Sequence, residues 1–175
     1  MNTNFNKNEK LNRLSILFTA SLLISFCYCG FYSFTGSSIP GHINAIAVPL
    51  FEDQTSEFQI KEKLTDFVID EITRDNSLKI VNEAQADAIV YGTIVRISDQ
   101  AHTYDQNEQV ESYRVWISVQ VEVKDVKNAT NMWKETWRQW GEYTLDPTSD
   151  ARLMGIEDAL KKIAEDVLTK TVSGW

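Results

Sequence analysis

Two stretches of the chain repeat apolar residues at the spacing of one helix face, with charged residues between them. In the first stretch the apolar positions are Ile60, Leu64, Phe67, Val68 and Ile72. In the second stretch they are Leu153, Ile156, Leu160, Ile163, Val167 and Thr171. This period predicts two amphipathic helices, one that stops at residues 75–77 and one that begins after the capping residues 146–150. Each helix therefore has one face to bury.

A different period, the strict alternation of apolar and polar residues, runs from Tyr113 to Lys124. Alternation is typical of a strand with one buried and one solvated face. A turn over residues 125–131 and a second strand over residues 132–144 complete a predicted antiparallel hairpin. Further strands are predicted where aliphatic and β-branched residues cluster, at residues 43–51, 78–81 and 88–98.

These elements predict one α+β domain over residues 43–175. The helices and the antiparallel strands each have an apolar face to cover, so the economical arrangement is a two-layer sandwich. In it both amphipathic helices pack on one face of a mixed four- to five-stranded sheet. The strands at residues 43–51 and 78–81 flank the first helix, and we expect them to pair in parallel through a right-handed crossover. Residues 99–110, rich in Asp, Gln and Asn, are expected to form a loop.

The N-terminal segment has the order of a secretory signal peptide. Residues 14–26 are uncharged and apolar apart from scattered small polar residues, and the basic residues Lys7, Lys10 and Arg13 precede them. The uncharged run is shorter than the roughly twenty apolar residues that a membrane-spanning helix requires. We therefore expect a signal peptide over residues 1–28, and an N-terminal anchor helix is the alternative.

A bacterial lipoprotein signal ends at a cysteine that becomes acylated after cleavage, and Cys27 and Cys29 are the two candidates. We favour Cys29, because the small, uncharged residues that follow it suit a flexible tether. Residues 29–42 are then a lipid-anchored tether, and acylation leaves the mature chain without a free thiol.

Charge excludes one class of partner. The chain has 17 basic and 25 acidic residues and a net charge of −8, and removing the signal peptide, with three basic and one acidic residue, lowers it to −10. Such a chain is not expected to bind nucleic acid. We found no nucleophile elbow, phosphate-binding loop or zinc-protease motif, and His42 and His102 have no partner at metal-ligand spacing. We therefore expect no enzymatic activity, no metal and no cofactor, and two solvated loop histidines.

Tryptophan and basic residues concentrate in the second strand of the hairpin. We expect Trp133, Lys134, Trp137 and Arg138 to form a candidate surface for a ligand or a partner, since exposed aromatic residues mark binding surfaces. The alternative is that the tryptophans pack across the strands and only stiffen the hairpin.

Four segments, in this order, are similar to the LptE family of lipopolysaccharide-assembly lipoproteins. They are CGFYSFTGSSIP at 29–40, IAVPLFEDQT at 46–55, LTDFVIDEITRDNSLKIV at 64–81 and ADAIVYGTIV at 86–95. The later segments also resemble other envelope lipoproteins with a similar α+β core, among them secretion-channel subunits and synthase activators.

The resemblance to LptE implies a non-enzymatic protein anchored through Cys29 on the periplasmic side of the outer membrane. It also implies a role as plug and assembly partner of an LptD-like β-barrel that delivers lipopolysaccharide to the cell surface. The alternative functions are a secretion-channel subunit, a synthase activator or, with less support from the motifs, a hydrolase.

Overall fold

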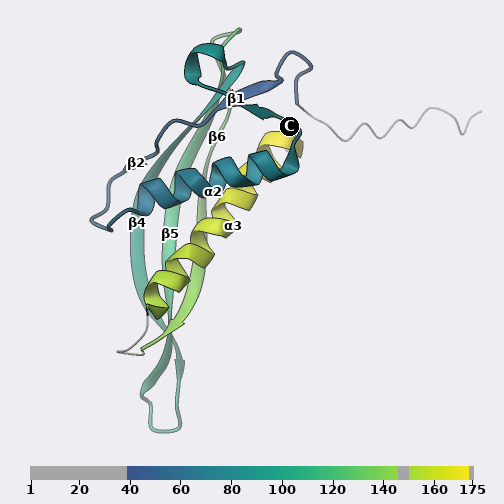
Figure 1. The fold of residues 1–175 in the computed structure, drawn as a ribbon. Helices are drawn as coiled ribbons and strands as arrows, with labels where there is room; N and C mark the ends of the chain where they lie inside the picture. Colours follow the sequence, from purple (N-terminus) through teal and green to yellow (C-terminus); the bar gives the residue numbers. More distant parts are fainter. Residues whose placement is uncertain (1–38, 146–149, 174–175) are drawn as a thin grey trace, which may run out of the picture. The chain divides into compact units, whose positions relative to one another are not determined.

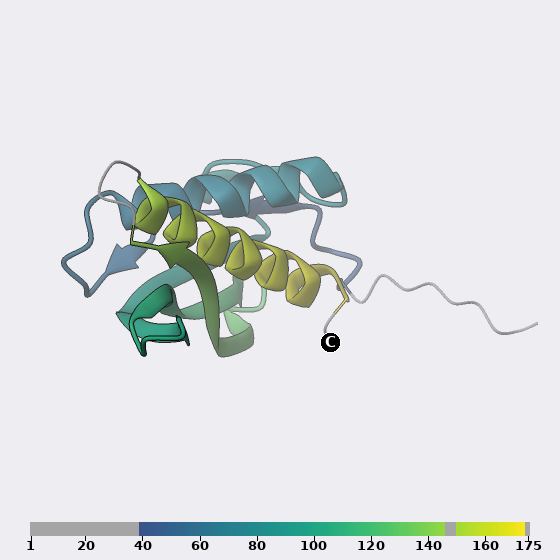
Figure 2. The same ribbon diagram turned by 90° about the horizontal axis from the view of Figure 1, so that it is seen from below.

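The computed structural model describes residues 39–145 and 150–173. The elements are β1 (Ala45–Ala47), β2 (Glu52–Asp53), α2 (Ile60–Asp75), β3 (Lys79–Ile80), the 3₁₀ turn η2 (Glu83–Gln85), β4 (Ala88–Tyr104), β5 (Val110–Asp125), β6 (Thr130–Thr144) and α3 (Ala151–Ser173). Both helices cover the same face of one sheet (Figures 1 and 2), which confirms the predicted two-layer α+β sandwich. No helix in the described ranges is both long enough and apolar enough to cross a bilayer.

The sheet is mixed, as predicted. Its order is β3-β1-β4-β5-β6, and β2 pairs with β4 beside β1. β1 pairs in parallel with both β3 and β4, whereas β4, β5 and β6 are antiparallel neighbours. The sheet has six strands, more than the four to five expected, because the predicted strand over 43–51 gives only β1 and β2 follows it after Pro49. Proline has no N–H to donate to a ladder, so it separates the two strands.

β4 is longer than the sequence predicts. The loop expected over residues 99–110 is wrong for residues 99–104, which pair with β5 from Asp99↔Val115 to Tyr104↔Val110. Most of these side chains are polar, and beyond Asp99 this end of the hairpin extends past both helices (Figure 1). The true turn is tighter, and the Asp105 carboxylate accepts the N–H groups of Asn107 and Gln109 at 2.8 and 2.9 Å.

The core lies between the helix layer and the inner face of the sheet. α2 buries Ile60, Leu64, Thr65, Val68 and Ile72. α3 buries Gly155, Ile156, Ala159, Leu160, Ile163, Ala164, Val167 and Thr171. Two residues of the predicted apolar stripes are less buried than expected, since Phe67 is half-buried and Leu153 remains 39% exposed. The buried faces also include small residues outside the predicted stripes, Thr65 on α2 and Gly155, Ala159 and Ala164 on α3.

α3 crosses β6 in direct backbone contact. A Cβ atom built on Gly141 would lie 1.8 Å from the carbonyl oxygen of Gly155, far inside van der Waals contact. Glycine inside a strand often marks such a close approach of another backbone. The contact is one-sided, because a Cβ on Gly155 would meet nothing nearer than 3.3 Å.

We predict that Gly141→Ala destabilises the domain strongly. The new methyl group must push α3 away from β6, and overpacking of this kind costs about 1–3 kcal/mol or more. The free energy of unfolding from urea melts measures the loss, which we expect to be at least ~2 kcal/mol.

Two glycine substitutions serve as controls. Gly155→Ala should change stability by less than ~1 kcal/mol, because the clash is mild and alanine favours the helix. Gly41→Ala should be nearly neutral, since nothing lies within 4 Å of its Cβ position. An equal loss from all three variants would show that the Gly141 contact is not special.

Candidate functional site

The face of the sheet that the helices leave uncovered carries most of the unusual side chains. Along β5 the buried residues alternate with Arg114, Trp116, Ser118, Gln120 and Glu122, none of which is fully buried. The register places these residues opposite outward-facing residues of β6. We call this surface the helix-free face.

Two tryptophans and two arginines form the centre of the helix-free face. Trp116 and Trp140 are cross-strand partners whose ring centroids lie 6.3 Å apart. The guanidinium of Arg114 lies 3.7 Å from the Trp140 ring centroid, and that of Arg138 lies 4.2 Å from the Trp116 ring centroid. Each arginine therefore stacks on a tryptophan in a cation–π contact. The stacks hold both charges on a flat surface.

A smaller ion-pair group lies further along the same strands. Glu122 faces Lys134 at 3.1 Å and Lys124 at 3.2 Å. Partial burial works against the ionised form of Glu122, but the hydrogen bonds from Lys134 and Lys124 hold its pKa below the usual value. These two lysines are therefore partly neutralised, in contrast to Arg138.

The structure divides the candidate surface predicted from the sequence between two faces. Lys134 and Arg138 are exposed on the helix-free face. Trp133 is only 8% exposed, Trp137 packs partly buried against the core, and their rings meet edge to face at 5.2 Å. Trp133 and Trp137 therefore lie on the inner face of β6, and Lys134 and Arg138 lie on the helix-free face. Cys29, the predicted lipidation site, lies outside the described residues.

The central aromatic pair was not predicted. The alternation from Tyr113 to Lys124 puts Trp116 on the polar side of its strand, but it does not show that Trp140 lies opposite Trp116. The signal was available in principle, because a hairpin register fixes which residues oppose each other across two strands. The turn alone did not fix that register, since a bulge between Val123 and Lys124 shifts it.

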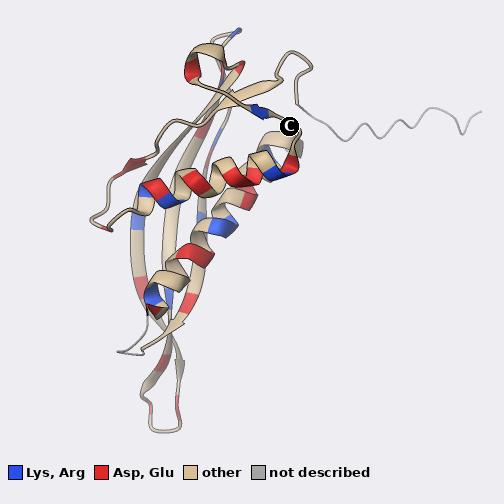
Figure 3. Cartoon of the chain, viewed as in Figure 1, with Lys and Arg blue, Asp and Glu red and all other residues tan. Residues whose placement is uncertain are grey.

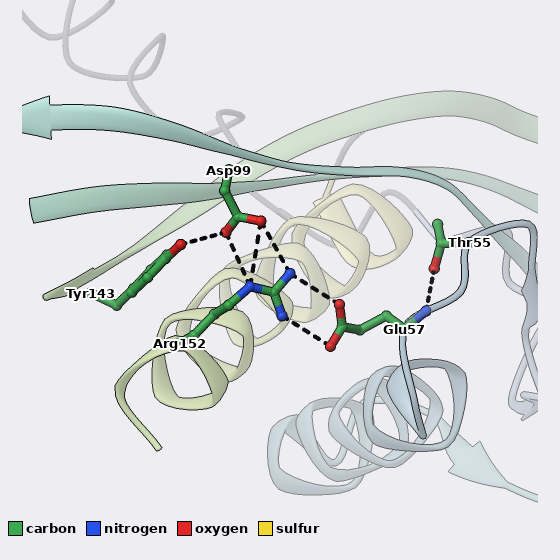
Figure 4. Close-up of polar contacts among 5 residues, drawn as sticks. All are labelled: Thr55, Glu57, Asp99, Tyr143 and Arg152. Atoms are coloured by element: carbon green, nitrogen blue, oxygen red, sulfur yellow. Dashed lines mark hydrogen bonds and ion pairs between the residues drawn. The ribbon is translucent and has the colours of Figure 1, made fainter. Parts of the chain in front are cut away.

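A second polar cluster lies on the inner face where α3 begins (Figure 4). The two terminal nitrogens of Arg152 each lie 3.0 Å from one oxygen of Glu57, which precedes α2. Arg152 also donates to Asp99 of β4, at 3.2 Å from Nη2, and the Tyr143 hydroxyl donates to Asp99 at 2.9 Å. The guanidinium of Arg152 on α3 thus contacts the segment before α2 through Glu57 and β4 through Asp99. The Tyr143 hydroxyl of β6 binds the same Asp99 carboxylate.

The contacts of the Arg152 cluster favour a protonated tyrosine and a charged arginine. Burial and then the hydrogen bond to Asp99 raise the pKa of Tyr143 to about 12, so its hydroxyl keeps its proton at neutral pH. The hydrogen bonds to Glu57 and then to Asp99 raise the pKa of Arg152 further above its usual range. The described residues also contain no group of three or more His, Cys, Asp or Glu side chains that could hold a metal ion.

His42, near the start of the described residues, contacts the turn between β5 and β6. Nε2 of His42 lies 2.6 Å from a carboxylate oxygen of Asp125, which is 4% exposed. The N–H of Asn128, and then His42, hold the pKa of Asp125 below its usual value. The expectation of two solvated loop histidines is therefore wrong for His42, whose ring contacts a buried carboxylate. It is also wrong for His102, which lies in β4 with Nε2 3.9 Å from a carboxylate oxygen of Glu142.

We predict that Arg152→Gln lowers the free energy of unfolding by about 1–2 kcal/mol, because Glu57 and Asp99 lose their shared counter-charge. Urea melts at neutral pH measure the effect. Lys63→Gln is the matched control, since it removes one partly exposed ion pair, with Glu157, between α2 and α3. The control should cost less than ~0.5 kcal/mol. If Arg152→Gln lowers the free energy of unfolding by no more than the Lys63→Gln control does, the Arg152 network does not stabilise the fold.

Comparison with solved structures shows the same fold in several proteins of low sequence identity. A Xanthomonas campestris protein has a TM-score of 0.56 at 10% identity, covering 73% of this chain and 83% of its own. The PelC dodecamer of Paraburkholderia phytofirmans has a TM-score of 0.53 at 13% identity, and the match covers 78% of this chain and 94% of the PelC chain. A Caulobacter crescentus protein described as a lipoprotein has a TM-score of 0.50 at 16% identity, and the match covers 69% of this chain and 86% of that protein's chain. The comparison with curated proteins found no match.

The fold and the site define a small α+β protein that has two helices on one face of its sheet. The other, helix-free face is solvent-exposed and carries aromatic and basic side chains. The family model of LptE, described as lipopolysaccharide-assembly, matches residues 43–171. The chain belongs to the LptE family, a non-catalytic family of envelope lipoproteins that take part in lipopolysaccharide assembly.

Proposed function

We propose that this protein is an outer-membrane lipoprotein subunit of a lipopolysaccharide translocon, where it acts as plug and assembly partner of an LptD-type β-barrel. The observation that carries the proposal is the LptE family match, which runs from residue 43 before β1 to residue 171 near the end of α3. It therefore includes both layers of the sandwich.

The surface of the domain is compatible with this role. Acidic and basic residues follow one another along α2 and α3 (Figure 3). The helix-free face carries the charged side chains of Arg114, Glu122, Lys134 and Arg138 beside its tryptophans. A plug inside a large outer-membrane barrel meets a polar lumen, because in such barrels the apolar residues face the lipid. A domain that is polar on both sides fits that surrounding better than a domain with one large apolar face.

Co-purification tests the proposal. An affinity-tagged full-length protein, extracted from its own membranes in mild detergent, should bring down an LptD-type β-barrel. A homo-oligomeric ring would instead support a secretion-channel subunit, and a bound synthase would support an activator. Either of these results, without a barrel, would contradict the translocon role.

The proposed anchor is the acylated Cys29, after removal of residues 1–28 and followed by the tether at 29–42. Each buried CH₂ group contributes about 0.8 kcal/mol, so one acyl chain binds a membrane only marginally and several hold it almost irreversibly. The anchored protein would face the periplasm from the outer membrane.

We predict that Cys29→Ala releases the protein from the membrane fraction or leaves its signal peptide uncleaved, while Cys27→Ala has no effect. Membrane fractionation and mass spectrometry of the mature N-terminus report the outcome. An unmodified N-terminus downstream of residue 29 in the wild-type protein would rule out lipidation at this cysteine.

A further inference from the structure

The segment that leads into β1 is held to the β5–β6 turn by one histidine. Nε2 of His42 lies 2.6 Å from a carboxylate oxygen of Asp125, the last residue of β5. The same carboxylate accepts the backbone N–H of Asn128 at 3.0 Å and its side-chain amide at 2.7 Å. His42 and Asp125 are 83 residues apart in the sequence. The contact is therefore a tertiary link between the entry of the chain and the end of the hairpin.

The next residues of the chain depend on a second carboxylate. The Asp87 carboxylate accepts the N–H groups of Asn44 and Ala45 at 2.9 and 3.0 Å. The N–H of Ile43 donates to the carbonyl oxygen of Pro40 at 2.9 Å. Three consecutive N–H groups are thus satisfied only while this short segment stays in place, so they report on its opening.

Two ionised carboxylates favour a positive charge on the entry segment. Asp125 is only 4% exposed, and its pKa is held below the usual value, first by the N–H of Asn128 and then by His42. The pKa of Asp87 is also lowered, first by its two backbone N–H bonds and to a smaller degree by the charges of His42 and Lys127. Lys127 is the opposing positive charge at this end of the hairpin.

The strength of the His42–Asp125 contact depends on the imidazole proton. A charge-assisted hydrogen bond is roughly twice as strong as a neutral one, and histidine changes charge between about pH 5 and 8. Asp125 sets the acidic limit, because its lowered pKa keeps it ionised below the usual aspartate range. The ion pair is therefore complete in mildly acidic solution. It weakens as the pH rises past neutral, and it is lost when Asp125 takes up a proton in strong acid.

We propose that His42 and Asp125 form a pH-sensitive latch that fixes where the chain leaves the domain. With the latch closed, the chain departs beside the β5–β6 turn. With the latch open, residues 40–42 are released and lengthen the connection by up to about 10 Å. Nothing lies within 4 Å of the Cβ position of Gly41, so packing at that residue does not oppose the movement. Only the role of the latch at the end of a lipid tether rests on the proposed function.

Amide hydrogen exchange of the full-length mature protein in neutral-detergent micelles, followed by NMR, tests the latch. The reporters are the N–H groups of Ile43, Asn44 and Ala45. Their protection factors, corrected for the intrinsic effect of pH, are compared at about pH 5.5 and about pH 8. We expect protection about three- to tenfold higher at the lower pH. The amide of fully buried Ile117 should show no comparable change.

Two variants assign the effect to the latch. His42→Gln keeps an amide donor but cannot take up a proton, so its reporters should show the lower protection at both pH values. His102→Gln is the matched control, because His102 on β4 also lies near a carboxylate, 3.9 Å from Glu142. The control should keep the pH dependence of the wild-type protein. Urea melts of both variants separate local opening from a change in global stability.

Equal protection of the wild-type reporters at the two pH values would overturn the latch. A pH dependence that survives in His42→Gln, or one that disappears in His102→Gln, would overturn its assignment to His42. The proposed anchor fails separately: if Cys29→Ala stays in the membrane fraction with a normally processed N-terminus, the lipid tether is refuted, while the exchange result still decides the latch.

Discussion

The backbone contact between Gly141 and Gly155 determines how the two layers of this protein meet. It lets α3 cross β6 so closely that a Cβ atom on Gly141 would lie 1.8 Å from the Gly155 carbonyl oxygen, and the Cβ position of Gly155 lies 3.4 Å from the side chain of Val115 on β5. The helix layer closes over the inner face of the central strands, where Val115, Ile117 and Val119 are fully buried. Because strand residues alternate, the same contact leaves every second residue of these strands on the uncovered face.

This division explains why tryptophan has two different roles in one hairpin. Trp133 and Trp137 contribute to the core beneath the helices, while Trp116 and Trp140 hold arginines in place on the helix-free face. The free edge of the sheet is protected in the same region. Among the described strands β6 pairs only with β5, and Lys162 of α3 donates to the carbonyl oxygen of Trp140 at 2.9 Å. With Lys134 and Arg138 exposed along β6, the edge disfavours pairing with another chain.

Local periodicity predicted most of the fold, because each helix and each alternating strand records in its sequence which side is buried. It predicted α2, α3, the β5–β6 hairpin and the parallel pairing of β1 with β3. It missed the end of β4, because uncovered strand residues are as polar as a loop. It also missed the pairing of Trp116 with Trp140, which depends on a strand register that a bulge shifts. Family resemblance, rather than periodicity, led to the function.

Site-specific photocrosslinking in intact cells tests the central claim, a plug within a translocon barrel, most directly. A photoreactive residue at exposed Thr136 probes the helix-free face, and one at exposed Asp70 probes the outward side of α2. A plug is surrounded by its barrel, so both positions should yield adducts with the same LptD-type protein, identified by mass spectrometry. Adducts only between copies of this chain, or adducts with a protein other than a barrel from both positions, would contradict the account.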